Sequence, residues 1–238
     1  MRLAKYLSAR GLASRRAAER LIQAGRVSID GATVTDPARS VSGGEQIVVD
    51  GAPVAAKQQL VVYAVNKPVG VVSTASDPQG RPTVVELVDR PPRLYPVGRL
   101  DIDTTGLILL TNDGTLAHRL THPSFEVPKT YRASVARPPV RGPALRTLRS
   151  GVRLEDGKTA PARVRLLAPD ALELTVHEGR KRQIKRMCQA VGHPVQRLER
   201  VAIGSLQLGD LESGAFRELS DPEVRALIAA GRLDDSPA

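Results

Sequence analysis

The stretch VGRLDIDTTGLILLTNDG, residues 97–114, constrains most strongly how this chain can fold. Residues 107–110 within it are as apolar as a buried strand, yet Arg99, Asp101 and Asp103 stand just before them. Burying a carboxylate costs several kcal/mol unless a cation or a hydrogen-bond donor compensates it. The sequence therefore predicts a compensated carboxylate beside a buried strand.

Two explanations fit that carboxylate. If residues 94–101 are extended, Arg99 and Asp101 point to the same side, two residues apart. Asp101 would then lie where a strand gives way to a polar loop, a position that holds catalytic groups rigidly yet open to substrate. A structural Asp–Arg pair that fastens the loop explains the pattern equally well, so the residues alone leave both explanations open.

Length and charge narrow the class of protein. A chain of 238 residues can form one large domain or two small ones, and its 35 Lys and Arg against 25 Asp and Glu favour a polyanionic partner. The single cysteine, Cys188, excludes an internal disulfide, so we expect a reducing cytoplasm. No apolar run reaches the roughly 18 residues that cross a bilayer, and we expect no membrane association.

Residues 1–50 have the pattern of a small independent module. Gly11 ends a first helix, Ser14 can cap a second over residues 15–24, and Asp30 and Gly31 form a hairpin turn. Residues 1–26 carry seven cations against one acid, more than a solvated surface requires. We expect a linker at 51–60, a second domain at 61–231 and a disordered tail at 232–238.

The second domain is predicted to be mainly β. Strands are expected at 60–65, 69–72, 94–100, 107–110, 130–135, 164–167 and 171–176, and helices at 115–120, 143–149 and 183–191. Ser220 and Glu223 form a capping box that opens a last helix, ending at residue 230. A second cationic cluster lies at residues 180–186, and basic clusters in two modules favour a long anion such as folded RNA.

Several common chemistries are disfavoured. The segment GVRLEDGKTA imitates a phosphate-binding loop, but five residues rather than four separate Gly151 from Gly157, and its Asp156 and Gly157 are typical of a hairpin turn. No serine nucleophile elbow is present. His118 and His122 stand four apart, but the following proline disfavours a helical metal-binding pair.

Four segments are similar, in order, to the motifs of the RsuA/RluB family of ribosomal-RNA pseudouridine synthases: KPVG, GRLDIDTTGLILLTNDG, KTYRASV and EGRKRQIKRM. The segment LAKYLSARGLASRRAAERLIQAGRVSIDG resembles the small RNA-binding domain first seen in the fourth small-subunit ribosomal protein. The family resemblance runs from residue 1 to about 217. It implies an α+β fold, in which this domain precedes a catalytic domain built on a mixed, mainly antiparallel sheet.

The resemblance also implies a function and a site. The family isomerises a uridine to pseudouridine without metal or cofactor, and its catalytic aspartate, tyrosine and basic residue fall on Asp101, Tyr131 and Lys185. Asp103 is assigned to loop structure. We expect ribosomal RNA as partner, the 23S more than the 16S, and a monomeric enzyme. The residues expected to bind RNA are Arg15, Arg16, Arg20, Arg26, Arg99, Arg180, Arg182 and Arg186.

The charge of Asp101 sets a further expectation. Full burial would raise a carboxyl pKa by up to about 3–5 units, and an opposite charge within about 4–6 Å would lower it by roughly 1–3. Lys185 is the partner that the resemblance implies, and Arg99 is the one that strand geometry suggests. Tyr131 would stack on the extracted base, an interaction worth roughly 1–3 kcal/mol.

Two other functions compete with this one. A non-catalytic RNA-binding or ribosome-assembly protein would need the cations but not a buried carboxylate. A glycosidase acting on sugars would need two carboxylates at a set spacing and no cationic modules. Whether the aspartate attacks the sugar or the ring, or removes a sugar proton, stays open.

Overall fold

The computed structural model describes residues 1–56 and 58–230, which form two compact units. The small unit comprises Met1–Leu60 with the short segments Arg90–Arg93 and Asn112–Gly114, and the large unit holds the other described residues. The tail predicted at 232–238 lies outside the described residues. Within residues 1–56 and 58–230, no helix has the length and apolarity needed to cross a membrane.

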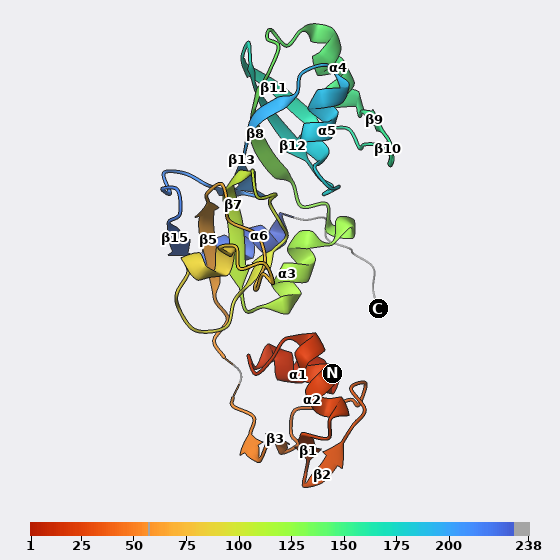
Figure 1. The fold of residues 1–238 in the computed structure, drawn as a ribbon, viewed down its shortest axis with the longest axis vertical. Coiled ribbons are helices and arrows are strands. Elements are labelled where there is room, and N and C mark those ends of the chain that lie inside the picture. Colours follow the sequence, from red (N-terminus) through yellow and green to blue (C-terminus); the bar gives the residue numbers. More distant parts are fainter. Residues whose placement is uncertain (57, 231–238) are drawn as a thin grey trace. The chain divides into compact units, whose positions relative to one another are not determined.

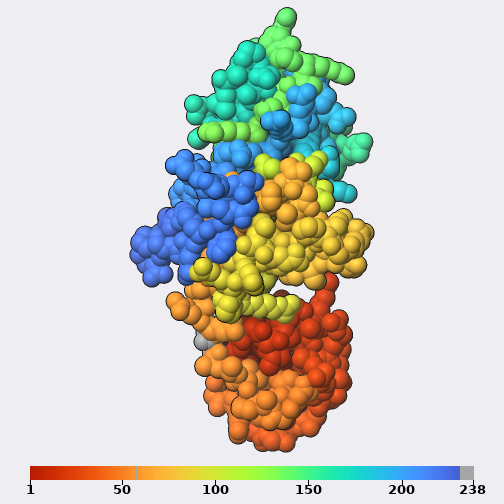
Figure 2. All heavy atoms as spheres, turned by 60° about the vertical axis from the view of Figure 1, so that its left-hand side comes forward, coloured from red at the N-terminus to blue at the C-terminus, as the bar shows by residue number. Residues whose placement is uncertain are grey.

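The small unit pairs two helices with a short sheet, as predicted (red to orange in Figure 2). Ser14 caps the second helix by accepting a 3.2 Å hydrogen bond from the amide of Ala17, and Leu3 and Ile22 are fully buried. The helices are α1 (Leu3–Ala9) and α2 (Arg15–Gln23), and the antiparallel sheet has the order β2 (Ala32–Val34), β1 (Val27–Ile29), β3 (Ile47–Val49), β4 (Ala52–Pro53).

A nine-stranded mixed sheet forms the centre of the large unit (Figure 1). Only the pairing of β7 with β13 is parallel, so the predicted mixed, mainly antiparallel α+β architecture is confirmed. The order is β11 (Arg163–Ala168), β12 (Ala171–Val176), β8 (Lys129–Val135), β13 (Val195–Ile203), β7 (Thr105–Thr111), β5 (Val62–Lys67), β15 (Phe216–Glu218), with β6 (Tyr95–Val97) on β7 and β14 (Leu206–Gln207) on β13.

Helices cover this sheet in two groups. Leu148 of α4 (Gly142–Ser150) and Met187 of α5 (Gln183–Ala190) share a buried cluster with residues of β8, β11, β12 and β13, so both helices pack on one face. Leu120 of α3 (Gly114–Thr121) and Leu227 of α6 (Asp221–Ala229) pack with residues of β5 and β7. The remaining short elements are β9 (Arg153–Leu154), β10 (Gly157–Lys158), η1 (Val84–Leu87) and η2 (Pro123–Phe125).

Three strand predictions need correction. Residues 69–72 form no strand, because the ammonium of Lys67 bonds the carbonyls of Pro68 and Val71, both at 2.8 Å, and bends the chain into a turn. The strand expected at 94–100 ends at Val97, because Gly98 adopts a positive φ of 74°. The nine-residue strand β13 was not predicted, since charged residues interrupt its apolar pattern.

Candidate active site

One row of directly paired residues crosses four strands of the large sheet. Lys67 of β5 faces Gly106 of β7, Gly106 faces Arg200 of β13, and Arg200 faces Tyr131 of β8. Gly106 has a φ of +99°, and a Cβ there would lie 2.3 Å from the carbonyl oxygen of Arg200. Only glycine permits this close approach of β7 and β13, which brings Lys67 and Tyr131 onto one row.

The Asp101 loop is fastened to the turn that follows β5. The amide of Gly70 donates to the carbonyl of Ile102 at 2.9 Å. The Ser73 hydroxyl donates to the carbonyl of Leu100 at 2.9 Å and accepts from the amide of Leu100 at 3.1 Å. Because Lys67 holds this same turn, its side chain supports the backbone on both sides of Asp101.

Tyr131 lies where two buried clusters of the large unit meet. It packs against the buried cluster that includes Leu100, the residue before Asp101, and against the cluster that includes Ile184, the residue before Lys185. The fold therefore brings Asp101, Tyr131 and Lys185 to one region of the large unit, from three separate motifs. Asp101 itself is partly buried.

The partner of Lys185 differs from the expectation. Its Nζ lies 2.5 Å from Oδ1 of Asp103, and Nη2 of Arg182 lies 3.8 Å from Oδ2 of the same residue. Among the described residues Asp101 has no ion pair, so the Asp101–Lys185 partnership stays a prediction, and the direct contact of Lys185 is with Asp103, which was assigned to loop structure. The hydrogen bond from Lys185 is the main cause that lowers the pKa of Asp103.

Lys67 is a buried cation that the sequence-based site did not include. Burial lowers its pKa to about 8, although the nearby carboxylates of Asp103 and Asp101 oppose this shift and the charge of Lys185 adds to it. Lys67, Asp101, Asp103 and Lys185 therefore form one interacting charge cluster. The signal that could have revealed Lys67 is its place at the end of the apolar strand 62–67.

Arg200 is the second residue that the sequence analysis missed. It is only 2% exposed, and its Nε donates to the carbonyl of Leu107 at 2.6 Å, where β7 parts from β13. Its Nη2 has no hydrogen-bond partner among the described residues. Burial, followed by the charge of Arg200, lowers the pKa of Lys129 to about 8. The run RLERVAI, residues 197–203, holds the exposed Arg197 and the buried Arg200, and nothing in its sequence indicates which arginine is buried.

Arg99 does not pair with Asp101. The strand ends at Val97, so the alternation that put the two side chains on one side is absent. Arg99 is exposed and makes no ion pair with the described residues. Its predicted contact with RNA stays a prediction.

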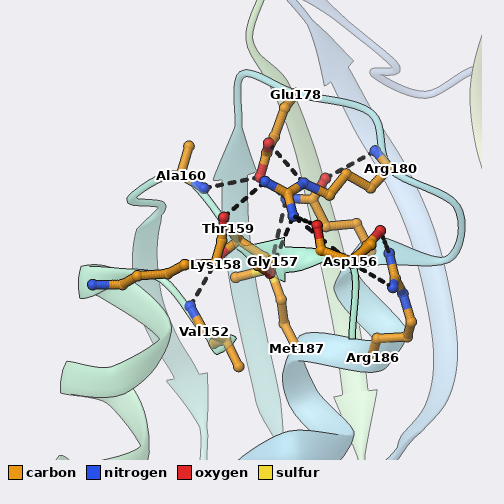
Figure 3. A network of polar contacts seen from close by, with 11 residues as sticks. Val152, Asp156, Gly157, Lys158, Thr159, Ala160, Glu178, Arg180, Arg186 and Met187 are labelled. Atoms are coloured by element: carbon orange, nitrogen blue, oxygen red, sulfur yellow. Dashed lines mark hydrogen bonds and ion pairs between the residues drawn. The ribbon is translucent and has the colours of Figure 1, made fainter. Parts of the chain in front are cut away.

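The other predicted RNA contacts fall into two groups. Arg15, Arg16 and Arg20 are exposed on α2, and Arg182 is exposed just before α5. The remaining three arginines donate hydrogen bonds to other groups of the protein. Arg26 forms a bidentate pair with Asp50, at 2.7 and 2.6 Å. Arg180 and Arg186 bind the β9–β10 hairpin (Figure 3).

The described residues contain no cluster of three or more His, Cys, Asp or Glu placed to hold a metal ion. The thiol of Cys188 is buried, and burial raises its pKa to about 12. The groups that the candidate site contains include carboxylates, ammonium groups and a phenol. Such groups can transfer protons, attack as nucleophiles and stabilise charge.

Comparison with known families agrees with this fold. Residues 61–190 match the family described as RNA pseudouridylate synthase, and residues 1–47 match the S4 domain. The chain belongs to the RNA pseudouridylate synthase family and is an enzyme of that class, with an S4 domain at its N-terminus.

Individual relatives match over nearly the whole chain. The chain is 46% identical to the ribosomal large subunit pseudouridine synthase B of Bacillus subtilis, with 96% of each chain covered. It is 37% identical to the ribosomal small subunit pseudouridine synthase A of Escherichia coli (strain K12), covering 96% of this chain and 100% of the relative. A crystal structure of a pseudouridylate synthase matches with a TM-score of 0.71 and 34% identity, over 95% of this chain and 99% of the other.

Proposed function

We propose that this enzyme converts a uridine in a structured segment of ribosomal RNA into pseudouridine, and that its substrate is the large-subunit RNA. The observation that carries the proposal is the match along almost the full length to a large-subunit synthase at 46% identity, against 37% for a small-subunit synthase. The exposed arginines of α2 support an RNA substrate, since phosphates attract clustered cations.

We assign the chemistry to Asp101, Tyr131 and Lys185. In the reaction the bond between ribose and a ring nitrogen breaks, the uracil turns over, and a bond forms to a ring carbon. The substrate and the product contain the same atoms. One proton moves from the ring carbon that forms the new bond to the ring nitrogen that is released. Asp101 acts as the ionised nucleophile or base, and Tyr131 presents a flat surface to the extracted base.

The charge cluster supplies what a partly buried carboxylate needs. Lys67 and Lys185 place two cations near the Asp101 loop, so its carboxylates have opposite charges close by. Asp103 accepts the hydrogen bond of Lys185 and directs that side chain toward the loop. In this assignment Asp103 holds the ammonium of Lys185 in the site, and Lys67 holds the turn that follows β5.

Pseudouridine mapping across both large ribosomal RNAs, in cells with and without this gene, tests the proposal. We expect one site in the 23S RNA to lose its signal when the gene is deleted and to regain it with the wild-type gene. The Asp101→Asn gene should not restore it. A lost site in the 16S RNA would overturn the large-subunit assignment, and no lost site would overturn the ribosomal substrate.

A further inference from the structure

The helix that carries Lys185 lacks an ordinary N-terminal cap. Arg182 occupies the cap position of α5 in a left-handed conformation, with φ of 50°, and its guanidinium, which has donors only, cannot cap the amides of the first turn. Neighbouring side chains hold the first turn instead. The Gln183 side chain accepts from the amide of Arg180 at 3.1 Å and donates to Glu178 at 2.7 Å, while Glu178 accepts from Nε of Arg180 at 3.1 Å.

Arg180 links this first turn to the β9–β10 hairpin (Figure 3). Its guanidinium donates to three successive main-chain carbonyls of the hairpin, those of Asp156, Gly157 and Lys158, at 3.3, 3.2 and 2.7 Å. The main-chain amide of Ala160, just after the hairpin, donates to Glu178 at 2.9 Å. With three carbonyls occupying its donors, Arg180 is a poor candidate for a phosphate contact.

Asp156, at the tip of the β9–β10 hairpin, links the hairpin to α5. Its two carboxylate oxygens accept from the two terminal nitrogens of Arg186, at 2.8 and 2.9 Å. Arg186 follows Lys185 directly on α5, and its hydrogen bond is the main cause that lowers the pKa of Asp156. Planar bidentate pairs of this kind fix orientation as well as distance.

We propose that Asp156 is a positioning residue for Lys185, acting through Arg186 and Arg180, which serve the helix rather than the RNA. The inference rests on the proposed catalytic role of Lys185. A residue that turns or shifts α5 moves the Lys185 ammonium away from Asp103, since adjacent helical residues share one rigid backbone. Misplacement of a catalytic group by about 1 Å can lower a rate by about 10²-fold.

The test compares Asp156→Asn with Glu155→Gln. Each change removes one negative charge, and the two positions are adjacent. Glu155 is exposed and makes no hydrogen bond or ion pair with the described residues, and it acts on Arg186 by charge alone, without the bidentate contact. We expect Asp156→Asn to lower kcat for pseudouridine formation at least about tenfold with KM for the RNA changed less than about twofold. Glu155→Gln should match the wild type in both.

Two further measurements separate positioning from other effects. Acetic anhydride should label Lys185 faster in Asp156→Asn than in wild type or Glu155→Gln, as measured by mass spectrometry without RNA. The double variant Asp156→Arg/Arg186→Asp should recover kcat relative to Arg186→Asp alone, because it restores the pair in reverse.

The outcomes are decisive in each direction. If Asp156→Asn changes KM or the salt dependence of RNA binding but leaves kcat and Lys185 labelling as in Glu155→Gln, Arg186 contacts RNA and the proposal fails. An inactive wild type would instead contradict the proposed function. The labelling comparison would still decide whether Asp156 positions Lys185, because it needs no substrate.

Discussion

Lys185 donates its short 2.5 Å hydrogen bond to Asp103, while Asp101, two residues earlier, has no ion pair among the described residues. Two carboxylates of one loop therefore have different environments. Asp103 is bound to a cation, and Asp101 keeps its oxygens available on a loop fastened from both sides. This division suits a site in which one carboxylate reacts and the other directs the basic partner.

Neutralising these two carboxylates should give different defects. We expect Asp101→Asn to lower the rate of pseudouridine formation by about 10²–10⁴-fold, the range for a lost general base or nucleophile, with RNA affinity unchanged. The measurement is single-turnover product formation, with binding followed separately by filter retention. Product formation by Asp101→Asn at the wild-type rate would remove Asp101 from the catalytic assignment.

Asp103→Asn should have a smaller effect, because it loosens Lys185 without removing it. We expect roughly a tenfold fall in kcat, and a larger fall in Lys185→Met. In the double variant the Asp103 change should add little to the Lys185 change, since the carboxylate acts through that side chain. Fully additive losses in this double-mutant cycle would show that Asp103 acts independently of Lys185.

The sequence indicated some residues of this candidate site and gave no signal for the others, for identifiable reasons. Asp101, Tyr131 and Lys185 lie in motifs with fixed order, so they could be named without a structure. Whether Lys185 binds Asp101 or Asp103 depends on how the chain turns at Gly98. No periodic sequence pattern predicts that turn. Element types were predicted well where apolar periodicity was strong, as in β7 and α5.

Residues whose roles depend on long-range pairing escaped the sequence analysis. Lys67 and Arg200 are buried because β5 and β13 both pair with β7 next to Gly106, a register that local pattern cannot specify. Arg180 was expected to bind RNA because it stands in a cationic run. Its partners are backbone carbonyls of the hairpin, and backbone acceptors carry no residue-type signal.

The buried ammonium of Lys67 should make stability depend on pH. Its pKa is about 8 in the fold, against an ordinary 10.5, so between these values the unfolded chain binds a proton that the folded chain has released. The free energy of unfolding should therefore rise with pH from about 8 to 10.5, by up to about 1.4 kcal/mol per pH unit from this group. Below about 8 the group adds no slope, and the burial penalty is present in full.

Urea denaturation of the wild type and Lys67→Met between pH 7 and 10 measures this contribution. We expect the slope above pH 8 to be shallower in Lys67→Met, while Lys129 contributes to both proteins alike. Lys181→Met, which removes an exposed lysine, should keep the wild-type slope. Equal slopes in Lys67→Met and wild type would show that Lys67 is not desolvated in the fold.

Because β7 and β13 approach closely at Gly106, a side chain at position 106 should destabilise the fold. Gly106→Ala adds a Cβ 2.3 Å from the carbonyl oxygen of Arg200, at a φ of +99°, and we expect a loss of at least about 2 kcal/mol of stability. Gly80→Ala is the control, because Gly80 also has a positive φ, 68°, but open space around its Cβ position. Its loss should be about 1 kcal/mol, and an equal loss in both variants would leave no role for the close approach.

The arginines of α2 should bind RNA through phosphate charge. Arg16→Gln should reduce the slope of log affinity against log salt by roughly 0.7–0.9, the value for one lost phosphate contact. Arg39→Gln removes the same charge from another exposed position of the small unit and should leave the slope unchanged. Arg26→Gln should also change it little, since Asp50 already holds that guanidinium in two hydrogen bonds. If Arg39→Gln lowers the slope as much as Arg16→Gln, the small unit attracts RNA by its overall charge, and α2 is not a specific contact surface.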